Sequence, residues 1–344
     1  MRRTIALLTA GLMILLLAGC GGKKEASTQI FAMDTVMGVT AYGGNAGKAV
    51  KAAEEEILRL EKLLSRTEAE SDISKLNAAQ GAPVEVNEEV ISLIKAAGAY
   101  SQATDGTFDI TIAPVVSAWG FTTDTYQVPE RETLDALLET VGMEHVRLDG
   151  RTVTLAAGTQ IDLGGIAKGY ASDKVEEMFE AYEVARGKVE LGGNILVLGD
   201  KPDGTPWRVG IQDPAKPNEQ AYAAILQLTD AFAVTSGSYQ RYFEANGNTY
   251  HHIIDPATGC PADSGLASVT VVADRHSGSG AMCDALSTAV FVMGEEKALE
   301  FWRSSDYDFE LVLVTEDGRV VVTEGLEEVL VKTEESGYTY EIVS

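Results

Sequence analysis

The chain has 344 residues, of which 45% are hydrophobic and 23% are charged, as is typical of a globular protein of one large or two ordinary domains. Its 27 basic and 52 acidic residues give a formal net charge of −25. Such a chain would be repelled by nucleic-acid phosphates, so we expect no nucleic-acid partner. Three cysteines are too few for a disulfide framework, and four histidines are too few for a histidine-rich metal site.

The N-terminus has the pattern of an export signal. Arg2 and Arg3 precede an apolar run over residues 5–17, which is too short to span a bilayer comfortably. The run ends in Leu-Ala-Gly-Cys, and a polar Gly-Gly-Lys-Lys stretch follows Cys20. This order resembles a bacterial lipoprotein signal. The alternative is a simple membrane anchor with an incidental cysteine.

The lipoprotein interpretation divides the chain into three parts. We expect residues 1–19 to be removed as a signal peptide, Cys20 to carry the lipid, palmitate included, and residues 20–27 to form a polar tether. Residues 28–344 would then be held at the bacterial cell membrane, on its extracytoplasmic side, by acyl chains instead of a spanning helix.

The rest of the chain alternates strand and helix patterns. Residues 30–42 predict a strand, and 46–64 predict an amphipathic helix. The later patterns predict helices at 87–103 and 130–141, a strand pair at 145–155, a helix at 166–182, a strand pair at 188–198, strands at 207–211, 223–228 and 267–273, a helix at 281–301, and a hairpin at 310–323 with Glu316-Asp317-Gly318 as its turn. With no internal repeat and only a weak seam at 200–204, the mixture predicts an α+β fold that forms one unit of one or two lobes.

A first candidate site is the segment IDLGGIAKGY at 161–170, which has the pattern of a strand end, a glycine turn and a helix start. Glycine amides can approach phosphate closely and a helix N-terminus adds partial positive charge, so this turn could cradle a diphosphate. Asp162 could cap the helix or accept hydrogen bonds from a base or a ribose, and Lys168 could meet a phosphate. The alternative is a glycine turn used for packing, with a solvated lysine.

A second candidate is the pair Asp284 and Thr288 on the predicted helix at 281–301. Four residues apart, the two side chains share one helix face. Mg²⁺ prefers oxygen ligands and takes some of them from water and substrate phosphates, so a carboxylate, a hydroxyl and a backbone carbonyl would suffice. The alternative is a helix cap and a packed hydroxyl.

A third candidate is the segment YHHIIDPATG at 250–259, which holds His251 and His252. Histidine is the side chain best suited to accept a proton near neutral pH. Zinc binding is disfavoured because no cysteine or acidic residue lies at a usual zinc spacing. A structural turn histidine is the other interpretation.

Two further segments contain residues that could line a binding site. The small hydroxyl residues at 233–239 do not resemble a nucleophile elbow, so we interpret them as wall residues and not as an acylating serine. Phe108 and Asp109 lie in an aromatic-containing stretch, 104–121, whose rings could stack on a planar ligand or belong to the core.

Taken in order, these segments resemble the ApbE family of FAD:protein FMN transferases over roughly residues 28–335. The motifs that carry the resemblance are MDTVMG, TDGTFDITIAPVVSAWGF, IDLGGIAKGYASD, VELGGNILVLG, AVTSGSYQRYF, HHIIDPATG and CDALSTAVFVMG. The resemblance implies an ApbE-like α+β catalytic domain that cleaves FAD in a Mg²⁺-dependent reaction. It also implies transfer of FMN through its phosphate to a Thr or Ser of an exported acceptor, typically a subunit of a membrane redox complex, with release of AMP.

The resemblance also assigns roles by position. It implies FAD contacts from Met37, Phe108, Asp109, Asp162, Lys168 and the backbone near Ile253. It implies a metal held by the carbonyl of Gly165 and the side chains of Asp284 and Thr288, and it makes His252 the base that activates the acceptor hydroxyl. Some family members carry a hydroxyl residue where this chain has Gly165, so this chain offers only a backbone carbonyl there.

Alternatives to the transferase are a Mg²⁺-dependent FAD pyrophosphatase, in which water replaces the protein hydroxyl, and a lipid-anchored flavin-binding or solute-binding protein without turnover. Cys260 and Cys283 flank the site motifs. We expect buried thiols at these two positions, with a disulfide as the alternative.

Overall fold

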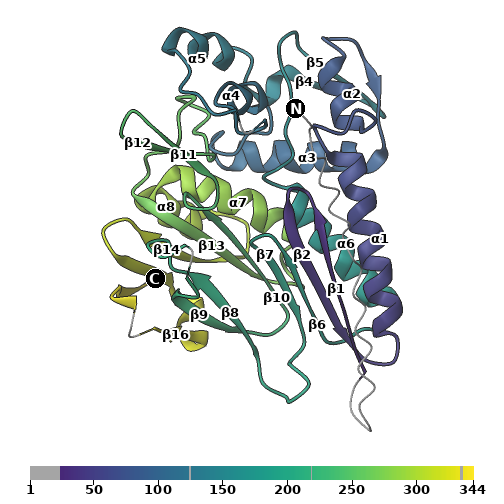
Figure 1. The fold of residues 1–344 in the computed structure, drawn as a ribbon, viewed down its shortest axis with the longest axis vertical. Helices are drawn as coiled ribbons and strands as arrows, with labels where there is room; N and C mark the ends of the chain where they lie inside the picture. The colour runs from purple at the N-terminus through teal and green to yellow at the C-terminus, as the bar shows by residue number, and fades with distance from the viewer. Residues whose placement is uncertain (1–23, 124, 218, 334–335) are drawn as a thin grey trace, which may run out of the picture.

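The computed structural model describes residues 24–344 apart from 124, 218, 334 and 335, and it shows a mixed α+β fold (Figure 1). The helices are α1 (Ala46–Leu64), α2 (Asp72–Ala78), α3 (Glu88–Ala103), α4 (Ala113–Ala118), α5 (Arg131–Leu138), α6 (Ala167–Ala181), α7 (Gly280–Met293) and α8 (Glu295–Ser304), with short 3-10 helices η1 (Met143–His145) and η2 (Glu324–Val329). The expected signal peptide and Cys20 lie outside the described residues.

The strands are β1 (Glu25–Ala32), β2 (Thr35–Tyr42), β3 (Val84–Glu85), β4 (Val146–Asp149), β5 (Thr152–Leu155), β6 (Gly187–Leu191), β7 (Asn194–Leu198), β8 (Trp207–Gln212), β9 (Tyr222–Leu228), β10 (Ala231–Gly237), β11 (Tyr242–Ala245), β12 (Asn248–His251), β13 (Leu266–Asp274), β14 (Glu310–Thr315), β15 (Arg319–Thr323), β16 (Leu330–Lys332) and β17 (Thr339–Val343). Since β1 begins at Glu25, the last three residues of the expected tether belong to this strand.

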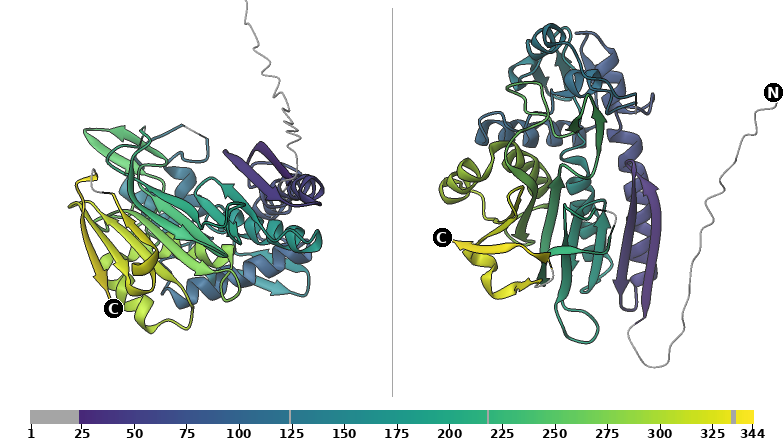
Figure 2. Two further views of the ribbon diagram at one scale, coloured as in Figure 1. Left: turned by 90° about the horizontal axis from the view of Figure 1, so that it is seen from below. Right: turned by 60° about the vertical axis from the view of Figure 1, so that its left-hand side comes forward.

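A nine-stranded sheet forms the centre of the fold. Its order is β1-β2-β6-β7-β10-β13-β14-β15-β17, and each pair is antiparallel except β15 with β17. The β1–β2 hairpin, in purple, and the C-terminal strands, in yellow, therefore lie at opposite edges (Figure 2). Smaller sheets have the orders β16-β9-β8, β3-β5-β4 and β11-β12.

The large sheet is buried on both faces. In β14, Leu311 and Leu313 belong to the main core, which also holds the buried residues of α1, α6 and α7. The intervening Val312 and Val314 belong to a second core, shared with β8 and β9. Because successive side chains of a strand point to opposite faces, one apolar strand serves both cores.

The structure confirms most predicted elements and corrects two. The helix at 46–64 has the predicted bounds. The single strand predicted at 30–42 is instead the hairpin of β1 and β2, because Met33 and Asp34 adopt left-handed backbone, with φ of 48° and 60°. The helix predicted at 281–301 is two helices, α7 and α8, which meet at Gly294 with φ of 76°.

Two further observations bear on the sequence expectations. Among the helices that the structure describes, none combines the length and the hydropathy that a membrane-spanning helix needs. Cys260 and Cys283 are both free of disulfide bonds, and Cys283 is buried whereas Cys260 is partly exposed.

Helices α6 and α7 approach so closely that only glycine fits at their contact. A Cβ added to Gly169 on α6 would lie 2.1 Å from the carbonyl oxygen of Gly280 on α7. Asp173, one turn further along α6, accepts hydrogen bonds from the amides of Gly280 and Ala281 in the first turn of α7. The two helices are therefore fixed to each other one turn before Asp284.

We expect Gly169→Ala to lower the free energy of unfolding by roughly 1–3 kcal/mol, because the added methyl group overpacks this contact. Gly47→Ala on α1 is the matched control, since a Cβ there would meet nothing within 4 Å. The control should be neutral or stabilising by about 0.5–1 kcal/mol. Urea unfolding of both variants checks this, and equal stability of the two would contradict the close contact.

Candidate active site

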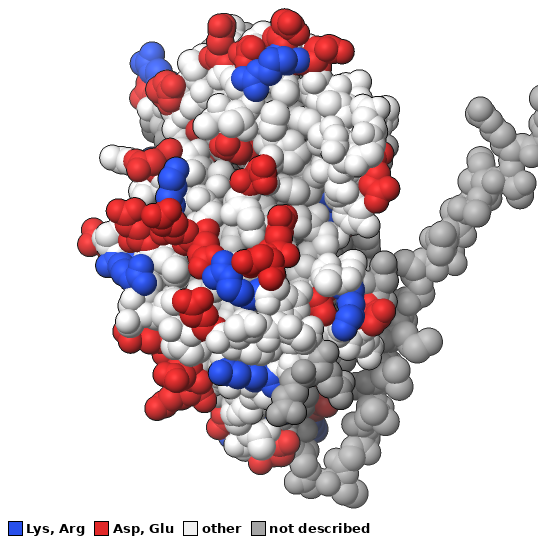
Figure 3. Space-filling model, turned by 90° about the vertical axis from the view of Figure 1, so that its left-hand side faces the viewer, with Lys and Arg blue, Asp and Glu red and all other residues white. Residues whose placement is uncertain are grey.

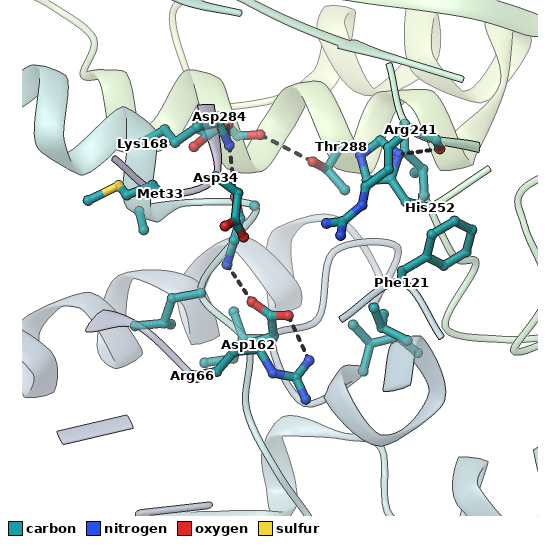
Figure 4. Close-up of a pocket in the computed structure, with 18 of the residues that line it drawn as sticks. Met33, Asp34, Arg66, Phe121, Asp162, Lys168, Arg241, His252, Asp284 and Thr288 are labelled. Carbon is teal, nitrogen blue, oxygen red and sulfur yellow. Dashed lines mark hydrogen bonds and ion pairs between the residues drawn. The ribbon is translucent and has the colours of Figure 1, made fainter. Parts of the chain in front are cut away.

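A cavity of about 530 Å³ lies beside one end of the large sheet. Its wall comes from the turn between β1 and β2, the segment after α1, residues 107–122, the glycine turn before α6, the ends of β7 and β10, residues 252–256, and one face of α7. Nine predicted site residues line it: Phe108, Asp109, Asp162, Gly165, Lys168, His252, Ile253, Asp284 and Thr288. Figure 4 shows Asp284 and Lys168 on one side of the cavity and His252 on the other.

Met37 is the predicted residue that does not line the cavity. Its side chain is fully buried in the main core, because alternate residues of β2 face the helices. Met33 and Asp34, in the turn before β2, line the cavity instead (Figure 4). The FAD contact that the resemblance implies for Met37 stays a prediction.

The carboxylate of Asp284 is held by groups from two other elements. Its side chain is only 5% exposed. Oδ2 accepts a hydrogen bond from the amide of Gly169 at 2.9 Å, and Oδ1 accepts one from the side-chain amide of Asn194 at 3.2 Å. The ammonium of Lys168 lies 3.9 Å from Oδ1 and donates to the carbonyl of Gly164 at 3.0 Å. Asp284 is thus fixed at the junction of α6, α7 and β7.

The bond from Gly169 to Asp284 has a consequence for Gly165. In a regular helix the amide of residue 169 would donate to the carbonyl of residue 165, but here it donates to the Asp284 carboxylate. No other backbone amide of the described chain donates to the Gly165 carbonyl. Thr288 is close by, because a Cβ on Gly165 would lie 3.5 Å from its hydroxyl oxygen. Gly165, Asp284 and Thr288, the three residues predicted to hold a metal, therefore all line the cavity, and Gly165 lies next to Thr288.

Asn194 was missed by the sequence reasoning, although the Gly-Gly-Asn turn before β7 could have drawn attention to it. Its side chain is 1% exposed and lines the cavity. The amide group donates to Asp284, but the buried carbonyl oxygen Oδ1 has no hydrogen-bond partner within the described structure. A buried unpaired acceptor is costly unless a ligand or ion satisfies it.

Arg66 was also missed, because it follows α1 without a recognisable motif. Its guanidinium donates to Asp162 Oδ2 at 2.9 Å and to the hydroxyl of Ser117 at 2.7 Å. The other Asp162 oxygen accepts from the amide of Gly164 at 2.8 Å. Asp162 therefore holds both the glycine turn and a cation that lines the cavity.

Phe108, Asp109 and Ile253 form mostly buried parts of the wall, with exposed fractions of 4%, 8% and 5%. Asp109 Oδ1 accepts from the amide and the hydroxyl of Thr111, at 2.8 and 2.6 Å. Burial raises the pKa of Asp109 despite these two bonds. The carbonyl of Ile253 accepts a hydrogen bond from the amide of Ala262 at 3.0 Å.

His252 is held as a neutral base. Its ring nitrogen Nδ1 lies 3.2 Å from the carbonyl oxygen of Arg241, which also accepts the backbone amide of His252 at 3.1 Å. A carbonyl can only accept, so Nδ1 carries the proton and Nε2 is left as the acceptor. The rings of Phe121 and His252 meet in a T-shaped contact, with centroids 6.4 Å apart. Burial lowers the pKa of His252 to about 4, which keeps it unprotonated near neutral pH.

His251 has a structural environment. Its Nε2 lies 3.0 Å from the carbonyl of Ala262, and its ring packs edge-on against Phe291 at 5.5 Å between centroids. In the described part of the chain, no group of three His, Cys, Asp or Glu side chains is arranged to hold a metal ion.

The small hydroxyl residues at the end of β10 form wall, as predicted. Thr235 and Ser236 line the cavity. The hydroxyl of Thr235 lies 2.8 Å from that of Thr270, and the hydroxyl of Ser236 lies 2.8 Å from that of Ser287 on α7. These pairs join β10 to β13 and to the helix that carries Asp284.

The low pKa of His252 predicts a pH-dependent stability. In the unfolded chain its pKa is near 6.5, whereas in the folded chain it is about 4. The unfolded state therefore binds more protons between these values, so this group's contribution to stability is full above pH 6.5 and is lost as the pH falls through 4. Urea unfolding of wild type and His252→Gln from about pH 7 to about pH 4.5 should show wild type losing more stability. If wild type and His252→Gln lose the same free energy of unfolding over this pH range, the low pKa of folded His252 is contradicted.

Comparison with known proteins agrees with this geometry. Residues 33–313 match the model of the ApbE family. The FAD:protein FMN transferase of Treponema pallidum is 34% identical over 92% of this chain and 93% of its own length.

Two crystal structures share the fold. The ApbE protein of Thermotoga maritima has a TM-score of 0.81 at 34% identity, covering 89% of this chain and 99% of that one. The apo flavinyl transferase ApbE of Pseudomonas stutzeri has a TM-score of 0.79 at 30% identity, covering 91% of this chain and 98% of that one. The chain therefore belongs to the ApbE family.

Proposed function

We propose that this chain, an FAD:protein FMN transferase, transfers FMN from FAD to a Thr or Ser hydroxyl of an exported acceptor protein in a Mg²⁺-dependent reaction and releases AMP. The family and the transferase activity rest on the comparisons. The observation that carries the proposal is the arrangement of one cavity, in which the oxygens of Gly165, Asp284 and Thr288 converge and His252 lines the same wall as a neutral base.

The residues at the Asp284 end of the cavity fit a magnesium ion. A buried carboxylate, a backbone carbonyl left out of the helix and a hydroxyl are the oxygen donors that Mg²⁺ prefers. The buried Asn194 Oδ1 beside Asp284 adds an unsatisfied oxygen to the same region. When bound, Mg²⁺ would stabilise negative charge on the phosphate oxygens of FAD.

The rest of the chemistry belongs to the chain itself. The acceptor hydroxyl oxygen forms a bond to the phosphorus of the FMN half, the bond from that phosphorus to the bridging oxygen breaks, and AMP leaves with its electron pair. His252 Nε2 takes the hydroxyl proton, while the Arg241 carbonyl holds the ring in the required tautomer. Lys168 and Arg66 place two cations in the cavity that can meet pyrophosphate charge.

The cellular setting is inferred from the sequence. A lipoprotein signal ending at Cys20 would place the enzyme on the extracytoplasmic side of the bacterial membrane, with exported subunits of membrane redox complexes as acceptors. An acidic body does not attract FAD at long range, so close contacts and the metal must capture it.

Incubation of the purified enzyme with FAD, Mg²⁺ and an exported acceptor domain tests the proposed function. We expect FMN to stay on the acceptor after denaturation and to be found on one Thr or Ser by mass analysis. AMP with only free FMN would show that the chain acts as a pyrophosphatase under these conditions. FAD that stays intact for hours would indicate a binding protein.

Two variants separate the proposed roles. We expect His252→Ala to keep its FAD affinity and to lose transfer by roughly 10²–10⁴-fold, because the proton acceptor is removed. Asp284→Ala should lose both turnover and the response of turnover to added Mg²⁺. Covalent flavin on the acceptor and FAD affinity are measured for each variant. Normal FMN transfer by both variants would contradict the roles proposed for His252 and Asp284.

Asn194 should tune the metal site without taking part in proton transfer. We expect Asn194→Ala to weaken Mg²⁺ affinity by about 10–100-fold, since it removes a group that orients the Asp284 carboxylate. Titration of Mg²⁺ against the FAD-bound enzyme measures this affinity. Asn248→Ala, at an exposed position of β12, is the control and should leave it unchanged. Equal Mg²⁺ affinities of Asn194→Ala and Asn248→Ala would contradict the proposed effect of the hydrogen bond from Asn194 to Asp284.

A further inference from the structure

The two-stranded sheet β11–β12 is connected at both ends to residues that line the cavity beside His252. Gln240 and Arg241 precede β11 and line the cavity, and His252 follows β12 and lines it too. Tyr242, the first residue of β11, pairs with His251, the last residue of β12, so the two ends of the hairpin that connect to the cavity lie side by side. Any polypeptide whose hydroxyl reaches Nε2 of His252 must therefore pass close to the hairpin.

Exposed aromatic side chains border this same wall. Tyr242 on β11 is 44% exposed, and Tyr126, whose ring lies 5.6 Å from that of the cavity residue Phe121, is 37% exposed. Phe31 and Val36 form another exposed pair, but they flank the β1–β2 turn, which Figure 4 shows across the cavity from His252. Exposed apolar side chains beside a site mark a surface that a partner can cover.

The aromatic side chains beside the hairpin pack on one another. The ring of Tyr126 stacks on Phe243 at 5.0 Å with 9° between planes, and Phe243 stacks on Tyr250 at 5.3 Å. Trp119 lies 5.2 Å from Tyr250 and is anchored by a hydrogen bond from its indole nitrogen to the carbonyl of Gly259 at 2.7 Å. A preorganised stack loses little conformational entropy when a partner binds, which favours its use for recognition.

The backbone of the hairpin offers a second means of recognition. Within the described chain, β11 and β12 pair only with each other, so both strands have an outer edge without a neighbouring strand. Such edges can accept an extended segment of another chain through main-chain hydrogen bonds.

Charge limits the composition of that segment. The chain carries a net charge of −25, acidic side chains outnumber basic ones across the face in Figure 3, and Glu244 is exposed on β11 itself. An acidic segment would be repelled, and an uncharged or basic one would not.

We propose that the flavin acceptor docks on the hairpin surface, defined as Tyr126, Tyr242 and the outer edges of β11 and β12, through an extended, uncharged or basic segment that places its Thr or Ser beside His252. This inference rests on the proposed function, because it names the binding surface for the protein substrate of that reaction.

The test is steady-state kinetics with an acceptor that receives covalent FMN from the wild-type enzyme. We expect Tyr242→Ala and Tyr126→Ala each to raise the KM for the acceptor by roughly tenfold or more, as for loss of an aromatic anchor, with kcat and FAD affinity within about twofold of wild type. Tyr222→Ala on β9, at a tyrosine that is 43% exposed and does not line the cavity, is the matched control and should leave all three values unchanged.

Phe31→Ala tests the opposite wall. An increased KM for Phe31→Ala together with unchanged values for both tyrosine variants would overturn the proposed surface, as would unchanged KM values for all of them. An increase in KM for the Tyr222→Ala control equal to that of Tyr242→Ala would also overturn it. If wild type instead releases AMP and free FMN with every acceptor tried, the proposed function itself fails and the docking proposal falls with it.

Discussion

The site depends on the burial of one carboxylate. Taking an ionised carboxylate out of water costs several kcal/mol unless hydrogen bonds or a cation compensate for the loss. Asp284 obtains its compensation from the Gly169 amide, from the Asn194 side chain and, at longer range, from Lys168. The first of these bonds is possible only because glycine at the α6–α7 contact lets the helices come together.

The same bond links the fold to the chemistry. By diverting the Gly169 amide, Asp284 leaves the carbonyl of Gly165 outside the helix, where it could serve as a second oxygen ligand for the proposed metal. Thr288, one turn along α7, would supply a third in the proposed site. His252 lies on the other side of the cavity and is kept neutral by burial, so the proposed proton transfer and the proposed metal binding would be performed by separate groups. The oxygens gather where phosphate charge would develop, and the base lies beside the hairpin from which an acceptor can approach.

Much of this could be predicted from the sequence, because local patterns and motifs carry it. The helix at 46–64 follows from apolar spacing, and the pairing of Asp284 with Thr288 follows from helical periodicity. The left-handed turn at Met33 and Asp34 was not predicted, because Asp tolerates that backbone conformation but Met rarely adopts it, and the turn contains no glycine.

Other residues were missed because their roles depend on tertiary contacts. Arg66 reaches Asp162 across 96 positions of sequence, and Asn194 reaches Asp284 across 90. No local sequence pattern predicts a contact between residues so far apart in the sequence. The low pKa of His252 likewise follows from burial, which outweighs the opposing effect of the hydrogen bond to the Arg241 carbonyl, and no motif can show this. The aromatic stack under the hairpin joins residues near 120 with residues near 245, so it also became visible only in the folded chain.

The most direct test of the central claim is a crystal structure of the enzyme with FAD and Mn²⁺, which shares the oxygen preference of Mg²⁺ and can be located by its anomalous scattering. The account predicts one anomalous peak within coordination distance of the Gly165 carbonyl, the Asp284 carboxylate and the Thr288 hydroxyl, in contact with the pyrophosphate. A pyrophosphate bound elsewhere, or a metal coordinated without Asp284, would contradict it.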